Sequence, residues 1–420
     1  MNNSIAYKVA QLPRGALMVG IDPHKRTHAL VVTDASGNVL VRFQVSTDRP
    51  GFDTALARCN EWCRHTGAAG CVFGIEAGAH YWRTIAYFLD EHKQLFYLIN
   101  PFTLKRQRDG NDLMRRKNDY RDAEMAAQLL REGKYTWTAL PRERYADLRT
   151  AHGTYQQLVL QVAQVKLQLI TALDGLFPEF MTVFKAVDGQ TALAVLTTCP
   201  NPATIAGMSD DEFVECISRT LGGRRLAAKK LQCLHQTASG TAGVRAGADA
   251  QAQRIELLAD RLAFLQMQRQ MAEDHLLDIF YQHSESQYLL SIHGLGAVNA
   301  AGILAHIGDI RAYSSAKQLP KVAGIIPIES SSAGHMASRT PMSKKGRPEF
   351  RLILYRAVIG LVRHNESIKH YVTRLTTRSV AAHPLKKKEA VGAAMNKLLR
   401  IVYSLLTKRQ MFDPALAAAV

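Results

Sequence analysis

The chain has 420 residues, of which 47% are hydrophobic and 21% charged, as in a folded protein with two or three domains. No stretch approaches the roughly 18 apolar residues of a membrane span, and residues 1–15 lack the apolar core of a signal peptide, so we predict a cytoplasmic protein without membrane contact. The net charge of +17 indicates a polyanionic partner, and six cysteines without paired metal-ligand spacing argue against a zinc site and indicate reduced thiols.

The first hundred residues predict a mixed α/β domain, because short apolar runs alternate with turns and amphipathic stretches. Three strands come first, and helices and strands then alternate, which is the element order of an RNase H-like fold. The expected strands are 17–21, 28–33, 39–45, 71–75 and 95–99, and the expected helices cover about 50–65 and 80–92.

Four carboxylates are placed as in a metal-dependent nuclease. Asp22 ends one buried run at its exposed end, and Glu76 ends another. Asp119 and Asp122 lie three residues apart on a predicted helix, so they share one helix face. Carboxylate oxygens suit Mg²⁺, and Mn²⁺ fits the same oxygens. The sequence therefore predicts an enzyme that processes phosphodiesters.

A basic segment, 104–121, precedes this helix. Within it, Asp109 and Asp112 repeat the spacing of the helical acid pair, but the helical pattern does not follow them. We therefore interpret Asp109 and Asp112 as solvated loop charges.

Two long heptad patterns occupy the middle of the chain, at 158–176 and 255–279. They predict two long helices, which form either an antiparallel pair within one chain or a dimer arm. Residues 178–250 between them are expected to be a small helical insertion. This divides the chain into an α/β domain (1–147), a coiled-coil region (148–285) and a basic, mainly helical domain (286–420).

Two glycines open the predicted helix 297–307. Gly294 and Gly296 form a Gly-x-Gly turn, which can bring backbone N–H groups close to a phosphate, as in helix-hairpin-helix units. A plain helix–helix turn would have the same sequence.

The C-terminal stretch is strongly basic. Residues 331–420 contain 17 Lys and Arg but four Asp and Glu, so +13 of the net charge lies there. A solvated face would explain this, but nucleic acid is favoured because a serine-rich loop lies in the same region. That loop could hold a nucleophilic hydroxyl, although serine runs are usually flexible loops or caps and no local His/Asp pair activates a serine here.

Several motifs together resemble the DEDD transposases of the insertion sequence 110 family. They occur in the family's order, span about residues 17–360 and leave 178–250 uncovered. The motifs are GIDPHK at 20–25, GIEA at 74–77, KNDYRDA at 117–123, HGLG at 293–296, IGDI at 307–310, AGIIP at 323–327 and MSKKG at 342–346.

The resemblance implies a RuvC-like nuclease domain, a coiled-coil linker and a helical transposase domain with a catalytic serine. In the family this serine lies five residues after the Pro of A-G-x-x-P and twelve before the Lys of S-K-x-G. Both counts reach Ser332. Ala333 stands where the family usually has glycine, which leaves Ser331 as an alternative nucleophile.

By the same resemblance, the enzyme would excise and insert its own mobile element and associate with the nucleoid when it acts. A structured noncoding RNA of the element, the bridge RNA, would pair with donor and target DNA and so carry the choice of sequence. The carboxylates, with Mg²⁺, would act with Ser332 of another subunit to form a phosphoserine–DNA intermediate. This requires at least a dimer, and a tetramer is expected on synapsed DNA.

Basic residues near both parts of the implied site would bind backbone phosphates, although each one could equally be a solvated charge. They are Lys117, Arg121, Lys344, Lys345, Arg347 and Arg351. Two alternatives remain. A hydrolytic RuvC-like junction nuclease would need no serine, and a non-catalytic nucleic-acid-binding scaffold would use the acids structurally.

Overall fold

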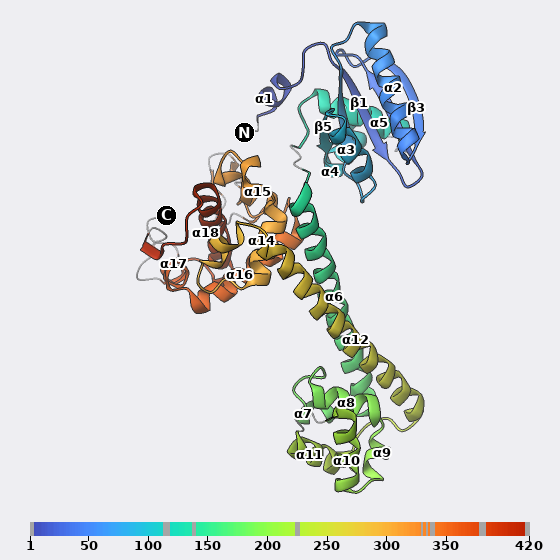
Figure 1. Cartoon of the computed structure of the whole chain (residues 1–420), viewed down its shortest axis with the longest axis vertical. Coiled ribbons are helices and arrows are strands. Elements are labelled where there is room, and N and C mark those ends of the chain that lie inside the picture. Colours follow the sequence, from blue (N-terminus) through green and yellow to red (C-terminus); the bar gives the residue numbers. More distant parts are fainter. Residues whose placement is uncertain are drawn as a thin grey trace. The chain divides into compact units, whose positions relative to one another are not determined.

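A computed structural model describes residues 4–111, 118–136, 140–222, 227–328, 331–332, 335–336, 341–377 and 384–415 (Figure 1). The chain forms two compact units, Met1–Leu140 and Pro141–Val420. Among the described residues, no helix is long and apolar enough to cross a membrane.

The first unit contains a five-stranded sheet in the order β3-β2-β1-β4-β5. β1 pairs antiparallel with β2 and parallel with β4. This mixed sheet with helices is consistent with the predicted RNase H-like α/β domain, and all five predicted strands are confirmed. The strands are β1 (Leu17–Pro23), β2 (Thr27–Thr33), β3 (Val39–Ser46), β4 (Cys71–Glu76) and β5 (Leu95–Ile99), and the helices are α1 (Ile5–Ala10), α2 (Arg49–Thr66), α3 (Trp82–Glu91), α4 (Pro101–Asn111) and α5 (Asp119–Arg131).

Helix α4 was not predicted. It begins at Pro101, and the side chain of Asn100 accepts a hydrogen bond from the backbone N–H of Phe102 at 2.8 Å. A capping Asn followed by Pro at the first helical position is typical of a helix start. Here the Asn directly follows a predicted strand, so in the sequence the pair indicates the end of that strand. Asp109 is therefore exposed on a helix, which corrects its assignment to a loop, and Asp112 lies outside the described residues.

The side chains of β1 alternate between the two faces of the sheet. Leu17, Val19 and Ile21 belong to the core that also contains the buried residues of α2 and α3. Met18 belongs to the opposite core, which contains the apolar face of α5. The same alternation places Asp22, four residues beyond Met18, on the α5 side.

The second unit begins with two long helices, α6 (Glu143–Leu176) and α12 (Ala248–Tyr281), which pack along each other within one chain (Figure 1). The insertion between them is helical, as predicted, and shares their core. Its helices are α7 (Phe180–Val183), α8 (Gln190–Thr198), α9 (Pro202–Ala206), α10 (Asp210–Leu221) and α11 (Ala228–Ala238). The buried heptad residues include Val162, Val165, Leu169, Ala172, Leu176, Ile255, Leu262 and Leu265.

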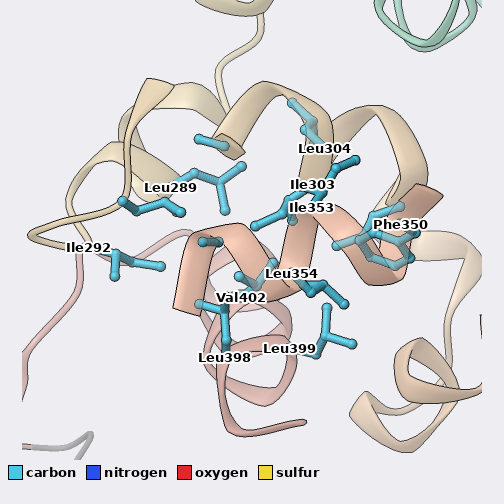
Figure 2. Packing of buried hydrophobic residues seen from close by; sticks show 14 of the residues in the cluster. Leu289, Ile292, Ile303, Leu304, Phe350, Ile353, Leu354, Leu398, Leu399 and Val402 are labelled. Carbon is cyan, nitrogen blue, oxygen red and sulfur yellow. The ribbon is translucent and has the colours of Figure 1, made fainter. Parts of the chain in front are cut away.

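The C-terminal helices surround a second core, to which the ends of α6 and α12 also contribute. Figure 2 shows Leu304, Ile353 and Leu398 pointing into this core from three different helices. Burial of each such side chain contributes about 1.5–3 kcal/mol. The helices are α13 (Ser286–Leu290), α14 (Ala297–Ile307), α15 (Leu319–Ala323), α16 (Pro348–His364), α17 (Glu366–Thr376) and α18 (Lys387–Lys408), with 3-10 turns at Ile310–Ala312 and Ala316–Gln318.

Two histidines are buried where α6 meets α14. The rings of His152 and His306 pack edge to face with centroids 5.4 Å apart, and His306 stacks on Phe350 at 5.2 Å. Burial, together with the nearby positive charge of Arg149, lowers the pKa of His152 to about 4. Burial also lowers the pKa of His306. Both rings are therefore neutral in the folded protein at neutral pH.

We expect the second unit to lose stability as the pH falls from about 6.5 to about 4. Over this range an unfolded histidine binds a proton that the buried ring does not, so protonation favours unfolding. The lowered pKa of His152 corresponds to about 3 kcal/mol across the window. Urea unfolding followed by far-UV circular dichroism should show this fall, and His152→Gln should reduce it. His370→Gln, at an exposed site on α17, is the control. An unchanged pH dependence in His152→Gln would contradict the assignment.

Candidate functional site

β1 and β4 carry the same pattern on the face that packs against α5, namely a glycine two residues before an acid. Gly20 precedes Asp22, Gly74 precedes Glu76, and the parallel register pairs Gly20 with Gly74. Because side chains alternate along a strand, both acids lie on the α5 side. The register therefore brings Asp22 and Glu76 together at the carboxyl ends of two neighbouring strands.

Gly20 lets α5 approach the sheet closely. A Cβ atom on Gly20 would lie 1.8 Å from the backbone oxygen of Ala123, so no residue with a side chain fits at this position. Helix α5 begins after its N-cap Asn118, so its first turn carries Asp119 and Asp122. The close contact one turn later places these two acids beside the strand ends.

The other three predicted acids lie around Asp22. Ligand oxygens of Asp22, Glu76 and Asp122 lie within 4.8 Å of one another. A second group, in which Asp22 and Asp119 meet the imidazole of His24, satisfies the same limit. The two groups share Asp22, and together they contain all four acids.

Asp22 is buried, which corrects the expectation of an exposed strand end. The residue is 6% exposed because α5 covers it, and among the described residues no hydrogen bond reaches its carboxylate. Burial, opposed by His24 and reinforced by the negative charges of Glu76, Asp122 and Asp119, raises the pKa of Asp22 to about 7. A buried carboxylate without a donor is costly unless a cation binds it. These residues therefore fit a divalent metal.

Arg108 is a site residue that sequence reasoning missed. Its Nη1 donates to both carboxylate oxygens of Asp122, at 3.0 and 2.9 Å. The Asp122 side chain is only 4% exposed, and a buried carboxylate needs a partner of opposite charge. The half-buried guanidinium of Arg108, from α4, supplies that charge. The sequence showed Arg108 only as one of several basic residues, because the contact depends on a helix that was not predicted.

His24 was quoted within a motif but given no role. Its ring lies between two acids, with Nδ1 3.8 Å from Asp22 Oδ2 and Nε2 3.9 Å from Asp119 Oδ1. The spacing alone could have indicated this, since residues two apart in an extended segment point to the same side.

The segment that carries the predicted serine is a hairpin, although a loop was expected. The backbone N–H of Ser343 donates to Ile326 and that of Ile328 to Pro341, both at 2.8 Å. Farther out, β6 (Ser331–Ser332) pairs antiparallel with β7 (His335–Met336). Of Ser331 and Ser332 only the backbone belongs to the described residues.

Two arginines expected to bind phosphate also contact the main chain at the base of this hairpin. Arg347 Nη1 donates to the carbonyl of His306 at 2.7 Å, and Arg351 Nη1 donates to that of Ala323 at 2.8 Å. Both side chains are half-buried. This structural role was missed, because a basic run in sequence does not show which cations bind the main chain.

The remaining predicted cations are exposed or lie outside the described part of the chain. Lys344 and Lys345 are exposed beside the hairpin, and Arg121 is exposed on the first turn of α5. Lys117 lies outside the described residues.

The Gly-x-Gly turn precedes α14 as expected. Gly294 adopts φ 88°, and a Cβ there would lie 2.9 Å from Cβ of His364. Asn365 Nδ2 also donates to the carbonyl of His293 at 2.9 Å. Packing against the end of α16 therefore accounts for Gly294, whereas a Cβ on Gly296 would point into open space.

Comparison with known proteins connects these features to one family. A model of DEDD transposases of IS110 elements, described as a transposase, matches residues 19–178, and a model described as transposase IS116/IS110/IS902 family matches residues 286–373. These matches cover the acids and the serine hairpin, respectively.

Individual relatives agree with the two models. The chain is 27% identical over 319 residues to the mini-circle transposase for IS117 of Streptomyces coelicolor, covering 74% of this chain and 76% of that protein. It is 21% identical over 409 residues to an uncharacterized 44.8 kDa protein of IS116 from Streptomyces clavuligerus, covering 95% and 96%. A pilin gene-inverting protein of Moraxella bovis is 29% identical over 126 residues, 30% of this chain and 38% of that protein. The chain therefore belongs to the IS110 family of transposases.

Proposed function

We propose that this protein cleaves and rejoins DNA to excise and insert its own mobile element. The observation that carries the proposal is the gathering of Asp22, Glu76, Asp119 and Asp122 at one edge of a sheet with RNase H-like strand order. A relative named for the inversion of pilin genes supports a recombinase rather than a simple nuclease.

The four carboxylates are the proposed ligands of a divalent metal, for which Mg²⁺ is the first candidate and Mn²⁺ the second. The metal, when bound, would offset the charge that builds on a scissile phosphate. Arg108 would keep Asp122 oriented toward the cluster through its two hydrogen bonds, at 3.0 and 2.9 Å.

Ser332 is the proposed nucleophile. The serine oxygen would bond to phosphorus while the bond between phosphorus and one DNA oxygen breaks. The DNA oxygen would leave as a hydroxyl, and its proton would balance the one that the serine hydroxyl loses. A DNA hydroxyl would then attack the phosphoserine and release the serine hydroxyl. One phosphate ester replaces another at each step, so the exchange needs no ATP.

The site proposed here is shared between subunits, with the carboxylates of one chain acting together with Ser332 of a second. A tetramer on two synapsed DNA duplexes and a bridge RNA that selects donor and target DNA belong to the same proposal. The +13 charge of residues 331–420 supports a polyanionic partner. Lys344 and Lys345 on the hairpin side, and Lys117 and Arg121 on the carboxylate side, are the proposed phosphate contacts, with Gly294 and Gly296 at the turn before α14.

We expect a serine-linked DNA adduct when the purified protein is incubated with the element's RNA, donor DNA and target DNA. Protease digestion and mass spectrometry should locate the adduct on Ser332. Ser332→Ala should abolish it, whereas Ser331→Ala should retain it. An adduct lost only in Ser331→Ala would move the nucleophile by one residue. Cleavage at full rate by both variants would instead favour a hydrolytic nuclease.

A further inference from the structure

His24 is held in a fixed position beside the carboxylate cluster, directly after β1. Its backbone N–H donates to Thr27 O at 3.1 Å, and its carbonyl accepts from Thr47 Oγ1 at 3.2 Å. Fixing the backbone on both sides limits the positions that the ring can reach. The imidazole of His24 is therefore placed between Asp22 and Asp119 by the fold of the first unit.

The distances around this ring leave space for an ion. The nitrogens of His24 lie 3.8 Å from Asp22 and 3.9 Å from Asp119, which is too long for hydrogen bonds. Two ligand atoms that each lie about 2.1 Å from a shared cation are separated by no more than about 4.2 Å. The two separations run to different nitrogens of the ring. When one ligand atom is counted from each residue, Asp22, His24 and Asp119 lie within 4.8 Å of one another, so a small rotation of the exposed His24 and Asp119 side chains would bring all three to a shared cation.

A second observation, on the residue that both groups share, also indicates a ligand at the cluster. The side chain of Asp22 is 9% exposed and points into the cluster, and among the described residues no hydrogen bond reaches it. Asp119 and His24 are 45% and 41% exposed, so this side of the cluster is open to solvent ions. The position formed by Asp22, Asp119 and His24 is thus accessible to solvent ions and contains a carboxylate without a hydrogen-bond donor.

We propose that His24 supplies a nitrogen ligand to a second divalent cation, held with Asp22 and Asp119 beside the all-oxygen position of Asp22, Glu76 and Asp122. Mg²⁺ is a hard ion that proteins bind through oxygen, whereas first-row transition ions also accept imidazole nitrogen. This corner of the site therefore takes a first-row transition ion such as Mn²⁺ in preference to Mg²⁺. The inference deepens the proposed function, because it concerns the same metal site.

The test is Mn²⁺ binding to the full-length protein without nucleic acid. Pulsed electron paramagnetic resonance of the Mn²⁺-loaded protein, labelled with ¹⁵N-histidine, should show a histidine nitrogen bonded to Mn²⁺. His24→Gln should lose this signal and one of two Mn²⁺ ions per chain. Mutation of outer-shell partners of metal ligands already costs about 10- to 100-fold in affinity, so loss of the ligand itself should weaken that ion at least as much. His65→Gln, at an exposed position on α2, is the matched control and should change neither result.

A second variant separates the two positions. Asp122→Asn removes a ligand of the all-oxygen position and should leave the histidine nitrogen signal in place, whereas Asp119→Asn should reduce it. A wild-type protein without the nitrogen signal, or a His24→Gln protein that retains it, would overturn the inference. Because no DNA is present, a nitrogen signal together with a failed serine-adduct experiment would leave the inference standing and reject the proposed recombination.

Discussion

Replacement of Asp22 by Asn is expected to abolish DNA cleavage and at the same time to stabilise the metal-free protein above pH 7. The buried carboxyl keeps its proton up to a pKa of about 7, whereas an unfolded aspartate loses it near pH 4. Between these values the folded state binds more protons than the unfolded state, so stability falls as the pH rises through the window. This change in pKa lowers the free energy of unfolding by about 4 kcal/mol above pH 7. Asn has no proton to lose in this range, so Asp22→Asn avoids this loss of stability.

Urea unfolding in EDTA at several pH values from 4 to 8 measures this effect. The free energy of unfolding of the first unit should fall across the range in the wild-type protein and should fall less in Asp22→Asn. Replacing EDTA by free Mn²⁺ at a hundred times its dissociation constant should stabilise the wild-type protein by about 2.7 kcal/mol, and Asp22→Asn much less. Asp109→Asn, at an exposed site on α4, is the control. Undiminished recombination by Asp22→Asn or Asp122→Ala would mean that the acids are structural and the protein is a non-catalytic scaffold.

Replacement of Gly20 by Ala is expected to inactivate the enzyme without touching a carboxylate. The added Cβ would lie 1.8 Å from the backbone oxygen of Ala123 and 2.6 Å from the backbone nitrogen of Ala127, so α5 must move away from β1. Such overpacking costs about 1–3 kcal/mol. The movement would also carry Asp119 and Asp122 away from Asp22 and weaken metal binding.

A series of glycine variants tests this argument with graded contacts. A Cβ on Gly74 would lie 3.1 Å from the backbone oxygen of Ala126, so Gly74→Ala should have a smaller effect than Gly20→Ala. Gly110 in α4 has open space around its Cβ position, so Gly110→Ala should be neutral or slightly stabilising. Urea unfolding and Mn²⁺ titration would rank the three variants. Equal stability of Gly20→Ala and Gly110→Ala would contradict the close packing of α5 on β1.

Much of the site was predictable because its signals are local. An acid directly after an apolar run marks the end of a buried strand, which identified Asp22 and Glu76. Two acids three residues apart on a helix share a face, which identified Asp119 and Asp122. The heptad spacing in α6 and α12 is equally local, and both helices are present. What each acid does in catalysis remains a prediction.

Other parts of the site could not be predicted, because they depend on contacts between segments distant in sequence. The bond of Arg108 to Asp122 needs both an unpredicted helix and its position over α5. The contacts of Arg347 and Arg351 with backbone carbonyls appear only once the hairpin has folded against α14 and α15. A basic residue looks the same in sequence whether it binds phosphate or the main chain.

The sequence by itself determined the RNase H-like element order, the identity of the four acids, the two long helices and the concentration of positive charge at the C-terminal end. These follow from periodicity and composition, which each segment carries alone. Only the tertiary structure decided that Asp22 is buried without a donor, that Arg108 neutralises Asp122 and that the ring of His24 also lies beside Asp119. Those features arise because the paired glycines of β1 and β4 allow α5 to lie against the sheet, a match between distant segments that no single segment encodes.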